Sequence, residues 1–81
     1  MLPTIRGGDI VHVDENFNFE NLKIGDIVIF YPEGEDFAPV HRIVQETEGG
    51  WITRGDNNKE NDPWVLTKEN FRGKIVRIDL K

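Results

Sequence analysis

Two segments of the chain carry side chains whose types and spacing could do chemistry. His41 lies in a run of strong β formers, residues 39–44, where a surface histidine has little structural purpose. The second segment, residues 53–64, holds Asp56 and Asp62 in a stretch rich in Asn. A histidine on a strand and an aspartate on the next loop are the base and the orienting group of an acyl-transfer site, which also needs a hydroxyl nucleophile.

Each segment also has a purely structural interpretation. A half-buried histidine bonded to a backbone carbonyl would account for His41. A wide turn, whose Asp and Asn side chains satisfy their own backbone, would account for residues 53–64. Residue types alone leave both interpretations open for each segment.

Metal chemistry is disfavoured by the residues present. Asp56, Asn58 and Glu60 have the alternate spacing of a calcium loop, but its central Gly and terminal bidentate Glu are missing. Zinc would need more ligands than the two histidines of a chain without cysteine, and His12 is expected at a solvent-facing strand position. We therefore expect no metal and no cofactor.

Composition limits the chain to one small acidic domain. Its 81 residues leave room for a single domain, and ten Lys and Arg against fifteen Asp and Glu give a net charge of −5, which disfavours nucleic acid as a partner. No window approaches the run of about 18 apolar residues that crosses a membrane, so the chain as given is expected to be soluble. The 81 residues contain no serine, so a serine nucleophile must come from outside them.

Turn residues recur along the chain and separate short runs rich in Ile, Val, Phe and Trp. This pattern predicts an all-β fold, a small single domain of short, mostly antiparallel strands. At most one helical turn is expected, at residues 67–71. The expected strands cover residues 9–14, 25–31, 39–46, 51–54 and 73–80.

Two of these strands carry specific burial predictions. The run Ile27–Phe30 is apolar on both pleat faces, which predicts a central strand covered on both sides. In the last strand, Val76, Ile78 and Leu80 alternate with charged residues, which predicts that these three face the core.

Six motifs follow one another in order along the chain. They are Met1-Leu2-Pro3-Thr4-Ile5, Gly8-Asp9-Ile10-Val11, Gly25-Asp26-Ile27-Val28-Ile29-Phe30, His41-Arg42-Ile43-Val44, Gly55-Asp56-Asn57-Asn58 and Gly73-Lys74-Ile75-Val76. The ordered set covers essentially the whole chain and resembles the catalytic domain of type I signal peptidases, membrane-bound serine endopeptidases that remove signal peptides from exported proteins. Because the general-base position holds a histidine rather than a lysine, the resemblance is to the archaeal and endoplasmic-reticulum branch.

The resemblance implies a fold and a set of site residues. The implied fold is the signal-peptidase and LexA-like β fold, for one domain over residues 1–81. His41 is the implied general base, with Asp62 as its partner and Asp56 supporting the geometry, although the residues alone do not separate the two acids. Leu2 and Pro3 are implied as substrate contacts.

Three aromatic residues could form an apolar rim near the membrane together with the Leu2-Pro3 end. They are Trp51, Trp64 and Phe37. Ordinary core packing of a small β domain accounts for the same residues and is the simpler interpretation.

One departure from the family pattern bears on activity. The family's nucleophile is the serine immediately before a Met-x-Pro sequence, and this chain starts at that Met. The domain is thus expected to lack both the nucleophile and the N-terminal membrane anchor, and to be inactive as given. It would be either a protease clipped after its serine or a nucleophile-less relative kept for its fold.

The resemblance also implies partners and a location. The implied partner is the signal-peptide region of secretory preproteins, with the membrane reached through the missing anchor. Full-length relatives are membrane-anchored, with the catalytic domain on the extracytoplasmic or lumenal face.

Two other functions compete with the peptidase. A non-catalytic β module that binds an extended peptide or a protein partner would explain the missing serine, but has no evident need for His41, Asp56 and Asp62. A self-cleaving repressor would use serine and lysine, whereas the candidate base here is a histidine and no basic DNA-reading segment is present.

Overall fold

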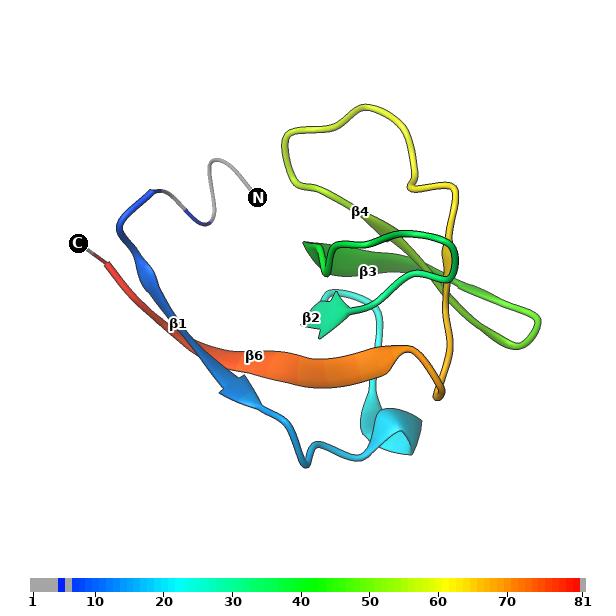
Figure 1. Cartoon of the computed structure of the whole chain (residues 1–81), viewed down its shortest axis with the longest axis horizontal. Coiled ribbons are helices and arrows are strands. Elements are labelled where there is room, and N and C mark those ends of the chain that lie inside the picture. The colour runs from blue at the N-terminus through cyan, green and yellow to red at the C-terminus, as the bar shows by residue number, and fades with distance from the viewer. Residues whose placement is uncertain (1–4, 6, 81) are drawn as a thin grey trace.

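The computed structural model describes residue 5 and residues 7–80, which form one antiparallel sheet (Figure 1). The order across this sheet is β1-β6-β2-β3-β4-β5. The predicted fold class, an all-β domain of short, mostly antiparallel strands, is confirmed. The elements are β1 (Ile10–Asp14), the 3-10 helix η1 (Phe19–Asn21), β2 (Ile27–Phe30), β3 (Val40–Thr47), β4 (Gly50–Arg54), β5 (Val65–Leu66) and β6 (Phe71–Asp79).

The predicted strands correspond to β1, β2, β3, β4 and β6, and the differences lie in short elements. Strand β5 was not predicted, because two residues are too few to show a period. It forms by pairing with β4, Trp51 opposite Leu66. At the expected helical turn, the Phe71 N–H donates to the Thr67 carbonyl at 3.0 Å, and this one turn leads into β6 without a helix.

Strand β2 lies between β6 and β3 and supplies the centre of the core. Val28 and Phe30 are fully buried, and they cluster with other apolar side chains on the same face of the sheet. Ile27 and Ile29, on the other face of the strand, are only half-buried. The prediction that both faces of this strand are covered is therefore wrong for the face that carries these two residues. The alternation is that of a strand with a single core face. The other buried members of the cluster are Leu22, Ile43 and Leu66.

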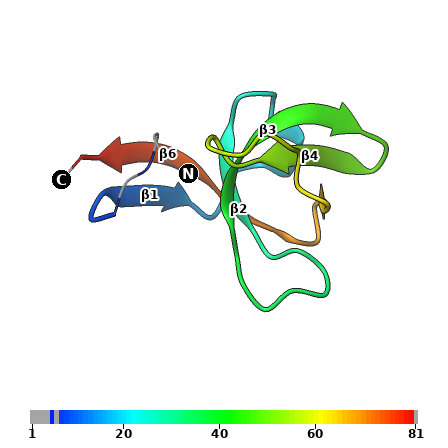
Figure 2. The same cartoon turned by 90° about the horizontal axis from the view of Figure 1, so that it is seen from above.

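The burial predicted for the last strand is wrong for Val76 and Leu80, whereas Ile78 is half-buried. Ile75 is the buried residue, whereas Val76 and Leu80 are exposed. Strand alternation puts Gly73 and Ile75 on the core face and Val76 on the other face. The register between β1 and β6 also shifts between His12 and Val13, a bulge that leaves Val76 without a residue opposite it. Beyond the bulge, β1 and β6 leave the rest of the sheet as a two-stranded ribbon (Figure 2).

The turn that joins β3 to β4 depends on two glycines for different reasons. Gly49 has φ +83°, a left-handed conformation that favours glycine. Gly50 is required by packing, since a Cβ at this position would lie 2.0 Å from the carbonyl oxygen of Leu66. The missing side chain therefore lets β5 approach β4.

Gly50→Ala should lower the free energy of unfolding by about 1–3 kcal/mol, the usual cost of overpacking, because the clashing atom belongs to the backbone and cannot rotate away. Gly7→Ala is the matched control, since a Cβ there meets nothing within 4 Å, and its effect should stay within about 0.5 kcal/mol. Urea unfolding followed by tryptophan fluorescence measures both. Equal midpoints for the two variants would contradict the close packing of β5 on β4.

Candidate active site

His41 lies near the start of β3, and its ring is bonded by an acid from the loop that follows β4. Pairing with Val28 of β2 fixes the backbone at His41. The ring Nδ1 and Asp62 Oδ2 form a hydrogen bond, and the two side chains are only 18% and 7% exposed. Because a carboxylate can only accept, Nδ1 donates, and in the neutral ring Nε2 then carries the lone pair. The pair lies mostly out of water, where such a bond is stronger than at the surface.

Asp62 reaches this position because the loop turns back onto β4. The Asn58 N–H donates to the Gly55 carbonyl at 2.9 Å, which closes the first turn of the loop. At its end, the Asp62 N–H donates to the carbonyl of Thr53 at 2.8 Å. The Thr53 hydroxyl donates to Asp62 Oδ2, also at 2.8 Å. The loop thus leaves β4 and returns to the same strand, carrying the carboxylate to the imidazole.

The second acid of the loop, Asp56, forms a bidentate ion pair with Arg42. Arg42 Nε and Nη2 donate to its two carboxylate oxygens at 2.9 and 3.0 Å, and Nη1 donates to the Gly25 carbonyl at 2.9 Å. The hydrogen bonds that Arg42 donates to Asp56 raise the pKa of Arg42 above its usual value, so the guanidinium stays charged.

These two contacts hold the loop from both faces of the sheet. Neighbouring residues of a strand point to opposite faces, so His41 and Arg42 face opposite ways. Asp62 meets His41 on the core face, where Ile43 and Thr53 also lie, and Asp56 meets Arg42 on the other face. The loop therefore wraps the end of the β3–β4 pair.

Gly55 leaves room beside the basic nitrogen of the imidazole. A Cβ at this position would lie 3.1 Å from His41 Nε2 and 2.9 Å from Asn58 Nδ2. The glycine does not have a positive φ, so the space rather than the backbone conformation accounts for it.

Trp64 packs next to the histidine and connects it to the core. Its ring lies 6.5 Å from the His41 ring, and edge-on contacts join it to Phe30 at 6.2 Å and to Phe37 at 5.6 Å. Trp64 and Trp51 both pack against the buried cluster, as expected if these residues belong to the core. Phe37 is exposed, so core packing does not describe it.

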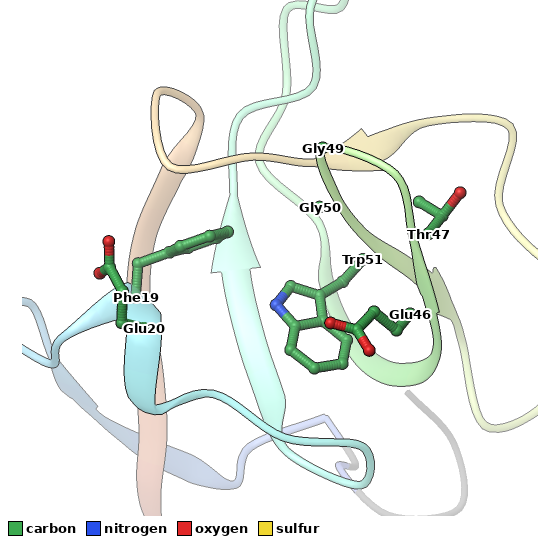
Figure 3. A pocket seen from close by; sticks show the side chains of 7 residues that line it. All are labelled: Phe19, Glu20, Glu46, Thr47, Gly49, Gly50 and Trp51. Carbon is green, nitrogen blue, oxygen red and sulfur yellow. The ribbon is translucent and has the colours of Figure 1, made fainter.

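Two cavities of about 290 Å³ each lie on the described surface. One shares Trp64 with the surroundings of His41, and its other walls are Glu33, Pro63, Val65, Thr67 and Asn70. The other lies at the turn end of the β3–β4 hairpin, where Glu46 lies beside the Trp51 indole and faces Phe19 and Glu20 of η1 (Figure 3). The remaining walls of that cavity are Thr47, Gly49 and Gly50.

The other histidine, His12, also contacts an aspartate, but in a different setting. His12 Nε2 lies 2.8 Å from Asp79 Oδ2, and Arg77 Nε donates to Oδ1 of the same carboxylate at 2.7 Å. The His12 and Asp79 side chains are 45% and 37% exposed, so water screens this contact. Burial distinguishes the His41 pair from this surface cluster.

The structure thus brings together His41 and Asp62 and places Asp56 on Arg42, while the catalytic role of all three stays a prediction. Leu2 and Pro3, the predicted substrate contacts, lie outside the described residues. Neither Thr53 nor Gly55 was predicted as a site residue. Gly55 was part of the Gly55-Asp56-Asn57-Asn58 motif and Thr53 began the segment 53–64, and these were the signals available.

Within residue 5 and residues 7–80, no three His, Cys, Asp or Glu side chains gather as a metal site. Among the helices of this part of the chain, none is long and apolar enough to span a membrane.

Several curated proteins are similar to this chain over most of its length. The signal peptidase complex catalytic subunit SEC11C of Homo sapiens is 36% identical over 67 residues, covering 76% of this chain and 34% of the relative. The catalytic subunit sec11 of Sclerotinia sclerotiorum is 33% identical over 87 residues, covering 94% of this chain and 51% of the relative. The corresponding SEC11 of Colletotrichum graminicola is 27% identical over 84 residues, covering 99% and 48%.

This chain therefore spans about one third to one half of the length of the curated relatives it matches. Their names confirm the resemblance predicted from the ordered motifs. No protein-family model matches the chain, and no solved structure matches it at the significance applied to the curated relatives.

The surface cluster of His12, Arg77 and Asp79 leads to a prediction about the pKa of Asp79. Hydrogen bonds from His12 and then Arg77 hold the pKa of Asp79 below its usual 3.8, because both stabilise the charged carboxylate. The cluster therefore stabilises the fold above the unfolded pKa, and this contribution is lost as the pH falls through the folded pKa. His12→Ala should raise the pKa of Asp79, and Arg77→Ala should raise it by less. Carboxyl 13C NMR measures both; an unchanged midpoint in His12→Ala would contradict the contact.

The space beside Nε2 predicts a local effect of Gly55→Ala. The added methyl should displace the His41 ring and shift its Hε1 resonance. The reason is that the new Cβ would lie closer to the ring than Cβ atoms usually lie to their neighbours. The Hε1 resonance of His12, on the distant ribbon, is the internal control and should not move. Identical behaviour of both resonances in the variant would contradict the placement of Gly55.

Proposed function

Because this chain is related in sequence to the catalytic subunits of the signal peptidase complex, we propose that it carries the base and orienting groups of a signal-peptide-cleaving serine endopeptidase. His41 is the general base and Asp62 its partner. The observation that supports this assignment is the mostly buried hydrogen bond between His41 Nδ1 and Asp62 Oδ2. It joins the two positions that the motif resemblance designates.

The geometry suits general-base catalysis of acyl transfer. With Nδ1 donating to Asp62, Nε2 can take the proton of a serine hydroxyl as that oxygen attacks the scissile carbonyl. Asp62 stabilises the imidazolium that forms. His41 then returns the proton to the departing amine, and water hydrolyses the acyl-enzyme by the same route.

The Arg42–Asp56 ion pair has a supporting role in this proposal. It fixes the first residues of the loop whose last residue is Asp62. Charge-assisted bidentate pairs hold geometry better than single contacts. Loss of the pair would loosen the loop without removing either group that handles the proton.

The nucleophile of this proposal is a serine directly before Met1. The 81 residues contain no serine, so by themselves they are proposed to have no useful peptidase activity. The proposed substrate is the signal-peptide region of secretory preproteins, bound as an extended strand. Membrane association on the extracytoplasmic or lumenal side is proposed for the longer protein, by analogy with its relatives' place in a signal peptidase complex.

Placing Ser directly before Met1 tests the proposal. The extended protein should cleave a signal-peptide substrate, and His41→Ala or Asp62→Asn in it should lower kcat by about 10³- to 10⁴-fold, as loss of a base or its orienting acid does. Asp56→Asn should have a smaller effect on kcat, because Asp56 bonds Arg42 and takes no part in the proposed proton transfer. The unextended 81 residues are the negative control.

A folded extended protein that cleaves nothing would contradict the peptidase. If it nevertheless bound the substrate, the non-catalytic peptide-binding module would be the better account.

A further inference from the structure

Thr53 is the residue that ties Asp62 to the sheet. It lies on β4 opposite Ile43 of β3 and is fully buried. It makes two hydrogen bonds to the same residue, both 2.8 Å long: its carbonyl accepts from the Asp62 N–H, and its hydroxyl donates to Asp62 Oδ2. Backbone and side chain of one aspartate are thus held by one threonine.

The hydroxyl of Thr53 and the ring of His41 bond to the same carboxylate oxygen. Oδ2 accepts from Thr53 Oγ1 and from His41 Nδ1, and the carboxylate is almost fully buried. An oxygen with two fixed donors has little freedom to rotate, because turning away would leave both donors unpaired in a dry environment. The direction of the Thr53 hydroxyl therefore fixes the direction of the carboxylate, and through it the direction of the imidazole.

Packing alone does not account for a threonine at this position. Valine has the same branched shape, and it would fill the same space without burying a polar group. The hydroxyl is satisfied by Asp62, and no buried side-chain nitrogen or oxygen of the described residues lacks a partner.

We propose that Thr53 is a positioning residue of the candidate site: its hydroxyl orients Asp62 so that His41 presents Nε2 to the nucleophile. The catalytic consequence rests on the proposed peptidase function, whereas the effect on the imidazole does not. The two can therefore be tested separately.

The first experiment uses the 81-residue chain and compares Thr53→Ser with Thr53→Ala, which differ by the hydroxyl alone. Exchange of the His41 Nδ1 proton with water, measured by NMR, should be about tenfold faster in Thr53→Ala than in Thr53→Ser, which should resemble the wild type. Urea unfolding of each variant supplies the global stability. Equal exchange rates in the two variants would overturn the proposal.

Thr53→Val separates a packing role from a positioning role, because the two roles predict opposite rankings of Thr53→Val and Thr53→Ser. A packing role predicts that Thr53→Val is harmless and that Thr53→Ser, which loses a buried methyl, is the more damaging change. A positioning role predicts that Thr53→Val speeds Nδ1 exchange, whatever its stability. Thr47→Val, the same substitution at the turn end of the hairpin, is the control and should leave the exchange unchanged.

The second experiment uses the protein extended by Ser before Met1. There Thr53→Val should lower kcat by about 10- to 100-fold with KM nearly unchanged, and Thr53→Ser should restore most of kcat, because a misplaced group costs turnover rather than binding. Cleavage that is unaffected by Thr53→Val would overturn the positioning role while leaving the peptidase intact. If no extended protein cleaves, the peptidase fails, and the exchange rates alone decide the role of Thr53.

Discussion

The structure depends on the return of the loop of residues 55–62 to the strand from which it started. His41 and Asp62 are far apart in sequence, and only this return places the carboxylate against the ring. Ordering a loop costs backbone entropy, which the contacts of the loop help to offset. The backbone bond to Thr53 and the ion pair to Arg42 are two such contacts, near the two ends of the loop. The site is therefore a consequence of how the loop is closed.

The two anchors of the loop have different electrostatic characters. Arg42 and Asp56 lie partly in water and hold each other as full charges. The pair on the core face is nearly dry and is supported by a neutral hydroxyl donor from Thr53. Placing the Arg42–Asp56 charge pair partly in water and the His41–Asp62 pair inside avoids burying an arginine, which would carry a large desolvation cost. The alternation of a β-strand makes this division possible, because adjacent residues of β3 serve the two faces.

Much of this could be predicted from the sequence, and the failures have physical reasons. The turn residues and β-branched runs located the long strands, and the histidine and the two acids stood out by type. Strand β5 was missed because two residues take their conformation from pairing with β4. The bulge at Val76 was missed because it arises between strands and leaves no period in one of them.

The role of Thr53 could not be predicted for a related reason. Threonine is an ordinary strand former, so its type signals structure, and its partner Asp62 arrives only when the loop has folded. The same holds for the choice between the two acids, which spacing left open. Strand alternation puts His41 and Arg42 on opposite faces of the sheet, and in the folded loop Asp62 bonds His41 while Asp56 bonds Arg42.

The ring nitrogens of His41 report most directly on the central interaction. In the 15N-labelled chain, at a pH where the ring is neutral, the 15N shifts should show Nδ1 protonated and Nε2 bare, and Asp62→Ala, which removes the acceptor, should abolish that preference. His12 provides an internal comparison on the ribbon. A neutral His41 with its proton on Nε2, or one whose ring shifts ignore Asp62→Ala, would contradict the account.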